Sequence, residues 1–330
     1  MSNLTDKHID NGPHIVAIGG GTGMPVLLRG LRHYTRNITA IVTVADDGGS
    51  SGRLRRELGV LPPGDFRNNI AALSRDEALM TQLLQYRFGG NGFGNGRSGL
   101  QGHAFGNLLI AALTGITGSF DEALLATQKV LAIRGQVMPA TLEHVTLVAD
   151  VLVKNGQTNA IKRIKGESAI SKARGRIQTL MLEPAHIRAY PPAVRAIFQA
   201  DLVVYGPGSL FTSILPNLLL PDLQGALSHS RAKKVYVCNI AIQPGETDDF
   251  TAKDHISALL QYIPENCLDY ALVNNNVAIS PQQGGGNTQF VSPVAHPQIP
   301  LHLADLVDGE RPWRHDSDKL ASAIISLLNS

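Results

Sequence analysis

A run of glycines near the start of the chain, Gly19-Gly20-Gly21-Thr22-Gly23, has the composition of an anion-binding turn. Glycine lets the backbone turn sharply and approach a ligand closely, and a following helix presents N–H groups and the positive end of its dipole. Because Met24 takes the sixth position of G-x-G-x-x-G and no Lys-Ser/Thr pair follows, the run matches neither a dinucleotide fingerprint nor a P-loop. The candidate ligand-binding residues are Gly20, Gly21, Thr22 and Gly23, although a tight structural turn would use the same glycines.

A second polar segment, residues 45–56, combines two carboxylates, a Gly/Ser-rich loop and three arginines. The carboxylates end an apolar run, at the position where dinucleotide-binding folds place an acid on a ribose hydroxyl. The small residues could fold their N–H groups into an anion-binding concavity, with an arginine forked onto phosphate. A solvated turn with capping aspartates is the alternative. The candidates here are Asp46, Asp47, Ser50, Ser51 and Arg53.

Two further segments carry weaker signals when each is taken alone. In residues 62–69, an aspartate could cap a helix or face a ligand, and the Arg and Asn that follow would lie in the first helical turn. In residues 102–107, a histidine lies between the glycine-rich segment 89–102 and the start of a helix, which suits either a structural role or a lid over a site. The candidates are Asp65, Arg67, Asn68, His103 and Asn107.

A second strand–glycine–helix junction spans residues 205–213, and its hydroxyls could cap the helix or bind phosphate oxygens. Two such junctions in one sheet suit a ligand with two ends, such as a diphosphate that joins a nucleoside to another group. Polar residues after later strands add an amide and an arginine, and we interpret the neighbouring His315-Asp316 pair as polar lining rather than as a base with its orienter. The candidates are Gly206, Gly208, Ser209, Thr212, Asn239 and Arg314.

The elements that position these residues are read from short apolar runs, which predict strands buried on both faces, as in a parallel sheet. Helical periodicity follows several of them, and Thr22 is expected to cap the first helix. A strand, a glycine turn, a helix and a strand make a right-handed βαβ unit. The predicted strands are 14–18, 38–44, 202–205, 235–238 and 270–273, and helices are expected up to residue 134, one of them with an apolar stripe at Leu108, Leu109, Ala112, Leu113 and Ile116.

The predicted architecture is a doubly wound, mostly parallel α/β sheet with a small antiparallel β insertion at about residues 141–190. The insertion is expected because strand-like periodicity begins at Val145 and Asn155-Gly156 is a hairpin signal. Residues 1–12 are expected to form a disordered tail, 13–330 a single domain, and 282–286 a polar, glycine-rich loop. In such folds the ligand lies beyond the carboxyl ends of the strands, which is where all of these motifs fall.

Composition limits the classes of function. The formal charge of +2 gives no general attraction to nucleic acid. The two cysteines, Cys238 and Cys267, lie beside apolar runs and are expected to be buried, reduced thiols, so neither a disulfide framework nor a metal site is predicted. No apolar run approaches the ~20 residues that span a bilayer. We expect a cytoplasmic protein that forms a homo-oligomer and associates with neither nucleic acid nor membrane.

Three functions remain open on these residues. The first is a non-catalytic regulator that binds a nucleotide or nucleotide sugar, because no convincing nucleophile or base is found. The second is a phosphotransferase in which Asp46 and Asp47 bind the acceptor or Mg²⁺. The third, an NAD-dependent dehydrogenase, is disfavoured by the broken fingerprint.

The motifs together resemble the CofD/YvcK-like family, and more narrowly the bacterial gluconeogenesis factors. The resemblance covers residues 13–328 and rests on nine motifs in the family's order: GGGTG (19–23), ADDGGSSGRLR (45–55), PPGDFRN (62–68), QYRF (85–88), GHAFGNL (102–108), YGPGSLFTSILPNLL (205–219), YVCN (236–239), QPGETD (243–248) and RHD (314–316).

This resemblance implies a Rossmann-like fold, a cytoplasmic location, and binding of a UDP-sugar such as UDP-N-acetylglucosamine, with a role in cell shape and carbon metabolism. It implies that Arg314 contacts the ligand and that Ser317 falls where some members carry a phosphorylated threonine. A related branch transfers 2-phospholactate onto a deazaflavin, and the chain departs from it in the segments SSGRLR, YVCN and QPGETD. It departs from the gluconeogenesis-factor pattern in residues 275–300, where glycines 284–286 replace an expected sugar-pocket tyrosine.

Overall fold

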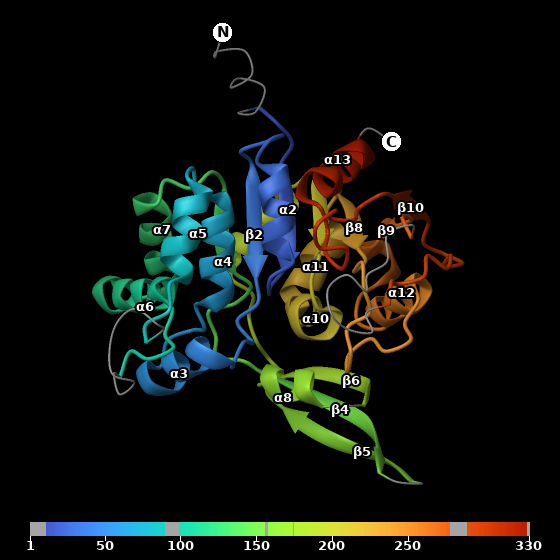
Figure 1. The fold of residues 1–330 in the computed structure, drawn as a ribbon, viewed down its shortest axis with the longest axis horizontal. Helices are drawn as coiled ribbons and strands as arrows, with labels where there is room; N and C mark the ends of the chain where they lie inside the picture. The colour runs from blue at the N-terminus through green and yellow to red at the C-terminus, as the bar shows by residue number, and fades with distance from the viewer. Residues whose placement is uncertain (1–10, 90–98, 156–157, 174, 278–288, 329–330) are drawn as a thin grey trace.

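A parallel sheet forms the centre of the molecule (Figure 1). The computed structural model describes residues 11–89, 99–155, 158–173, 175–277 and 289–328. Within these residues the main sheet has seven strands, and every neighbouring pair is parallel. In spatial order the strands are β10 (Leu301–Ala304), β9 (Tyr270–Asn274), β8 (Lys233–Val237), β7 (Leu202–Tyr205), β1 (Ile15–Gly19), β2 (Ile38–Val42) and β3 (Gln136–Pro139).

The central strands follow the apolar runs of the sequence. Every residue of β1 and of β7 is buried, because helices cover the sheet and leave no face for a polar side chain. The predicted mostly parallel α/β fold is confirmed, but the two edge strands, β3 and β10, were not predicted. Each has only four residues and pairs with a single neighbour, so its sequence carries a weak apolar signal.

The helices of the first half follow β1 and β2, and those of the second half alternate with the later strands. Helix α2 packs against α4 and α13, and α9 packs against α11. The first-half helices are α2 (Met24–Leu31), α3 (Gly49–Leu58), α4 (Gly64–Leu73), α5 (Glu77–Gln85), α6 (Phe105–Thr117) and α7 (Phe120–Val130). The later ones are α8 (Glu167–Lys172), α9 (Pro191–Gln199), η1 (Leu210–Ile214, a turn of π-helix), α10 (Leu215–Leu218), α11 (Pro221–His229), α12 (Ala252–Leu260), η2 (Glu265–Cys267, a 3₁₀ turn) and α13 (Ser317–Leu328).

Helix α6 is present as predicted, but its apolar stripe is not its buried face. Ile116 is 78% exposed, whereas the buried residues of the helix include Asn107, Ile110 and Ala111. The helix turns its polar Asn107 inward because that amide has partners there, which are described with the site. Periodicity therefore identified the helix and misplaced its inner face.

The predicted antiparallel insertion is a separate three-stranded sheet with the order β5-β4-β6. Its strands are β4 (Thr146–Asn155), β5 (Thr158–Lys165) and β6 (Arg176–Glu183), and α8 lies between the last two. Strands β4 and β5 pair up to Asn155 opposite Thr158, and the predicted turn residues 156–157 lie outside the described residues. Figure 1 shows this small sheet beyond the end toward which β2 points, while helix α13 lies toward the opposite end. The insertion therefore adjoins the carboxyl edge of the main sheet.

The chain reverses its direction of travel across the main sheet between β1 and β7. It proceeds outward from β1 through β2 to β3, then returns to the other side of β1 and proceeds from β7 to β10. The connections that leave β1 and β7 lead to opposite halves of the sheet at such a switch point, and ligands of doubly wound sheets bind there, beyond the carboxyl ends of the strands. The topology thus selects the turns after these two strands as the place to look for a site.

Several predicted features fall wholly or partly outside the described residues. These are residues 1–10 of the predicted tail, 90–98 of the glycine-rich segment, and the loop 282–286 with its glycines. At the end of the predicted tail, the carbonyl of Gly12 accepts a hydrogen bond from Asn37. Among the residues that the structure describes, no single helix is both long and apolar enough to cross a membrane; α6 and α7 pass that test only as a pair bent by 119°.

Candidate functional site

A cavity of about 620 Å³ opens at the switch point, at the carboxyl edge of the main sheet. The turn after β1, the turn after β7, the loop after β8, helix α8 and the segment before α13 all contribute to its wall. Eight candidate residues from the sequence line it: Gly21, Thr22, Gly23, Gly208, Ser209, Thr212, Asn239 and Arg314. The motifs that the sequence placed at the ends of separate strands therefore meet in one cavity.

The turns after β1 and β7 are pressed together backbone to backbone. A Cβ atom on Gly23 would lie 2.5 Å from the carbonyl oxygen of Pro207, and one on Gly208 would lie 3.3 Å from the carbonyl oxygen of Gly20. Gly21 has a φ of 67°, a conformation that disfavours side chains. The glycines are thus required by the contact between the two turns, as well as being suited to a close approach by a ligand.

The start of helix α2 differs from its prediction. The N-cap residue is Gly23, and no side chain caps the helix, so the predicted Thr22 cap is wrong. Thr22 is exposed and lines the cavity, and Pro25 occupies the first turn, where its missing N–H matters least. No side-chain oxygen caps the N-terminus of α2 at this wall.

The start of η1, after β7, has its own acceptors. Ser209 caps it by accepting a hydrogen bond from the N–H of Thr212. The carboxylate of Glu246, from the loop after β8, accepts from the hydroxyl of Ser209, from the N–H of Phe211 at 2.9 Å and from the N–H of Thr212 at 3.2 Å. Burial raises the pKa of Glu246, and these three hydrogen bonds oppose that rise. Of the two hydroxyls predicted to bind phosphate, that of Ser209 therefore has a carboxylate partner from the same chain, and that of Thr212 lies 2.6 Å from the Ser209 hydroxyl.

Asn239 holds two walls of the cavity together. Its amide nitrogen donates to the carbonyl oxygen of Gly208 and to the side-chain oxygen of Gln243, both at 2.9 Å. The turn after β7 is in this way fixed to the loop after β8. Gly206, at the same turn, has a φ of 83°, but it does not appear among the residues of the cavity wall.

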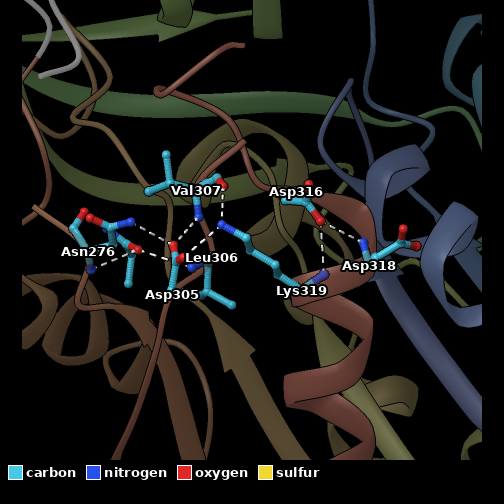
Figure 2. Close-up of polar contacts among 8 residues, drawn as sticks. Asn276, Asp305, Leu306, Val307, Asp316, Asp318 and Lys319 are labelled. Atoms are coloured by element: carbon cyan, nitrogen blue, oxygen red, sulfur yellow. Dashed lines mark hydrogen bonds and ion pairs between the residues drawn. The ribbon is translucent and has the colours of Figure 1, made fainter. Parts of the chain in front are cut away.

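The segment that carries Arg314 is anchored at both ends. Figure 2 shows Lys319 of α13 reaching Asp305 after β10, at 2.7 Å, and the carbonyl oxygen of Val307, at 3.0 Å. In the same view Asp316 accepts from the N–H groups of Asp318 and Lys319, so it caps α13. These contacts hold residues 308–316 against the cavity.

Arg314 itself is exposed and lines the cavity, as a phosphate contact should. Next to it, the Nε2 of His315 donates to the carbonyl oxygen of Cys238, and burial lowers the pKa of this imidazole to about 4. His315 is therefore bound to the backbone just after β8 and not to Asp316. Of this pair, His315 lines the cavity, whereas Asp316 is absent from the cavity wall and caps α13. Ser317 opens α13, and its carbonyl oxygen lies against Gly30 of α2.

A group of carboxylates adjoins the cavity. Asp65 lies in the first turn of α4, whose N-cap residue is Pro63, so its predicted capping role is wrong. Its carboxylate instead accepts from the N–H of Gly21 at 2.7 Å. Burial, and then the nearby charge of Asp46, raise the pKa of Asp65 to about 6. The pKa of the carboxylate that holds the glycine turn thus lies above that of an exposed aspartate.

Glu167 of the inserted element joins this group and also lines the cavity. Burial raises its pKa to about 7, and the charges of Asp46, Asp47 and Asp65 act in the same direction. Burial also raises the pKa of Asp46, which accepts from the N–H of Gly48 and from Ser51. The carboxylates therefore form an electrostatically coupled group at the edge of the cavity.

Asp47 joins the small sheet to the main one. Its carboxylate accepts from the N–H of Ser168 at 2.9 Å, at the start of α8. A Cβ atom on Gly166 would lie 2.2 Å from the same carboxylate. Asp47, the second of the two predicted aspartates, is thus bonded to the backbone of α8. This contact brings Glu167 to the cavity.

A chain of polar side chains runs behind the carboxylates, between α3, α4 and α6. The guanidinium of Arg67 donates to Asn68 and to Asn107, and Asn107 donates to Ser50, which lies 3.1 Å from Nδ1 of His103. Burial is the main cause of the lowered pKa of Arg67, to about 10, and of the lowered pKa of His103. These predicted residues lie together, but in a network of their own and not on the cavity wall.

Arg53, which was predicted to contact phosphate, does not line the cavity. Its guanidinium donates to the carbonyl oxygen of Gln101 at 2.7 Å, so it braces the segment before His103. Ser51 likewise accepts from the N–H of Gly64 and ties α3 to α4. In the described part of the chain, no three His, Cys, Asp or Glu side chains are placed to share a metal ion.

Sequence reasoning missed two acidic residues of the cavity wall, Glu167 and Glu246. Glu246 falls in a segment that the sequence marked as polar, but its bond to η1 depends on how two loops meet. Glu167 carries no local signal, because only the packing of α8 against Asp47 brings it to the site.

Comparison with known proteins places this geometry among relatives. The model of the family described as 2-phospho-L-lactate transferase CofD matches residues 15–322. A solved structure from Bacillus halodurans has a TM-score of 0.86 and 40% sequence identity, over 96% of this chain and 99% of that one. The gluconeogenesis factor of Bacillus subtilis is 43% identical over 330 residues, which are 96% of this chain and 98% of that protein. A relative from Nostoc sp. is 53% identical over 256 residues, which are 78% of this chain but only 53% of that protein.

Proposed function

The chain belongs to the CofD family, with close relatives named gluconeogenesis factors, and we propose that its cavity binds a nucleotide sugar of the UDP-N-acetylglucosamine type. The observation that carries the proposal is the meeting of two glycine turns, the amide of Asn239 and the guanidinium of Arg314 around one cavity at the switch point. Backbone N–H groups at the start of α2 and an arginine fork are suited to a diphosphate.

The role proposed for this binding is regulatory. The relatives' name connects them with gluconeogenesis, and the histidine on the cavity wall, His315, is hydrogen-bonded to the carbonyl oxygen of Cys238 rather than to a nucleophile. We include regulation of cell shape in the proposal, and a cytoplasmic location, which suits two buried and free cysteines. The protein would then report the level of a nucleotide sugar without consuming it.

Isothermal titration calorimetry with UDP-N-acetylglucosamine tests the proposal. We expect saturable binding without turnover, and Arg314→Ala should weaken it by about 1.5–3 kcal/mol, as for a charge-assisted contact. Arg311→Ala is the matched control, because Arg311 lies in the same segment but pairs with Asp308 and is absent from the cavity wall. Flat titrations with every UDP-sugar would remove the proposal.

A second candidate is a Mg²⁺-dependent transferase of phosphorus-containing groups, which the carboxylates beside the cavity favour. Mg²⁺ is commonly held by one or two carboxylates together with substrate phosphates. This candidate gives the binding of Mg²⁺ or of the acceptor to Asp46 and Asp47, whose charges act on Glu167 at the cavity wall. Such an enzyme would release a nucleotide in a Mg²⁺-dependent way when given a deazaflavin acceptor. Asp46→Asn should abolish that release, and no release from the unaltered protein would discard the candidate.

A further inference from the structure

Glu246 lies in the cavity wall and holds a cluster of hydrogen-bond donors at the start of η1. Two backbone N–H groups and one hydroxyl, all at the start of η1, donate to one oxygen of its carboxylate. Helix η1 runs directly into α10, so these donors lie at the start of a continuous helical segment. Such a set of donors is what a phosphate oxygen requires.

The position opens onto the site. Ser209, Thr212 and Glu246 all line the 620 Å³ cavity, although Glu246 is only 9% exposed. Glu246 also lines a neighbouring cavity of about 670 Å³, together with Asp248 and Phe250. Its carboxylate therefore stands between the two cavities, with its charge beside the place proposed for the ligand's phosphates.

We propose that Glu246 is a specificity-determining residue: its carboxylate fills the second anion position and confines the ligand's phosphates to the turn after β1 and to Arg314. This inference rests on the proposed function. It specifies that the site accepts a nucleoside diphosphate derivative and disfavours a triphosphate, whose further charge would meet the carboxylate of Glu246. A negative charge held within a few ångströms repels another strongly where water is partly excluded.

Three variants distinguish the effect of the charge of Glu246 from the effect of its side chain filling the position next to the η1 donors. Glu246→Gln keeps an oxygen that can accept from the N–H groups of Phe211 and Thr212 but removes the charge. Glu246→Ala vacates the position and leaves those donors facing the cavity. Asp248→Asn is the matched control, because Asp248 lies in the same loop, is exposed, and accepts a hydrogen bond from the N–H of Gly245.

The probes are UDP-N-acetylglucosamine, UTP and inorganic pyrophosphate, measured by calorimetry. We expect Glu246→Ala to bind pyrophosphate about tenfold more tightly than the unaltered protein does, because three donors gain an external partner. Glu246→Gln should raise the affinity for UTP about tenfold relative to UDP-N-acetylglucosamine, because repulsion is removed. Asp248→Asn should leave all three affinities unchanged.

Pyrophosphate should also raise the melting temperature of Glu246→Ala more than that of the unaltered protein, since it binds only the folded state. Equal pyrophosphate affinities in the two proteins would overturn the inference, as would loss of UDP-N-acetylglucosamine binding in Glu246→Gln. If no protein binds either nucleotide, the proposed function fails, and the pyrophosphate comparison still decides the role of Glu246. If Glu246→Ala does not fold, the UTP affinity of Glu246→Gln decides it.

Discussion

The turns after β1 and β7 are built from similar residues and are used differently. Each turn follows a buried strand, contains glycines, and leads into a helix at the same edge of the sheet. After β1, no side chain caps α2, and Asp65 accepts from the single N–H of Gly21. After β7, the start of η1 is covered by the hydroxyl of Ser209 and the carboxylate of Glu246.

This difference shows that a turn can have donors suited to an anion while those donors are already bonded to a side chain of the same protein. Glycines, a helix start and nearby hydroxyls create the capacity to bind an anion in both turns, and the sequence shows them in both. Availability depends on whether the chain supplies its own acceptor, and only the turn after β7 has one that satisfies several donors at once. We therefore propose that the phosphates of the proposed ligand bind at the turn after β1.

Replacing Gly23 should have the largest effect, because it forces the two turns apart. In Gly23→Ala, the new Cβ would lie 2.5 Å from the carbonyl oxygen of Pro207, and backbone cannot move aside as a side chain can. We expect a loss of about 2–3 kcal/mol in the free energy of unfolding, as for overpacking of a tight interior. Urea unfolding, followed by circular dichroism, measures this loss.

Gly115→Ala is the control for that measurement. Gly115 lies in α6 with no heavy atom within 4 Å of its added Cβ, so the change should raise stability by up to about 1 kcal/mol through helix propensity. Unaltered stability in Gly23→Ala would mean that the two turns are not held in contact in solution. The comparison between them would then lose its structural basis.

The coupled carboxylates predict a pH dependence of intermediate size. The pKa of Glu167 rises from 4.5 to about 7 in the folded protein, so the folded state holds this proton more tightly than the unfolded chain does. The stability associated with the neutral form is fully present below pH 4.5 and is lost as the pH rises through about 7. Glu167→Gln should therefore gain about 1–2 kcal/mol at pH 8 and nothing at pH 4.5, a smaller gain than the full shift implies because the group is partly exposed.

Chemical unfolding of both proteins at the two pH values tests this expectation. Glu183→Gln serves as a control, since Glu183 pairs with Lys165 on the surface of the same small sheet. That change should alter stability by less than about 1 kcal/mol at either pH. A gain at pH 8 that is no larger for Glu167→Gln than for Glu183→Gln would place Glu167 outside the coupled group.

The central strands and their turns could be predicted because their signals are local. The unbroken apolar run of β1, which is buried at every position, is typical of a strand covered on both sides, and the glycines that follow it predict a turn. The edge strands could not be predicted, because four residues with one neighbour need little apolar surface. In α6, the apolar stripe of Ile116 was a poor guide, because Asn107 has buried polar partners that no sequence pattern shows.

The location of the candidate site could be predicted from the sequence, but the hydrogen-bond partners of its residues could not. Topology brings the carboxyl ends of β1, β2 and β7 to one edge, so the motifs after them had to be neighbours. Which side chains face the cavity depends on contacts between distant loops, such as Asp47 with Ser168 and Glu246 with η1. As a result, some of the predicted residues line the cavity, and others belong to the polar network of Arg67, Asn107, Ser50 and His103.

The smallest effects should distinguish the two turns most directly. Ser209→Ala removes a cap and one donor to Glu246, so it should lower the free energy of unfolding by about 1 kcal/mol. It should leave the affinity for UDP-N-acetylglucosamine unchanged, because Ser209 already serves Glu246. Thr22→Ala should do the reverse: Thr22 is exposed and caps nothing, so stability should stay within about 0.5 kcal/mol while affinity falls. Calorimetry gives the change in ligand affinity of each variant, and urea unfolding gives the change in its free energy of unfolding. If Ser209→Ala loses affinity and Thr22→Ala does not, the phosphates belong to the turn after β7 and our assignment is reversed.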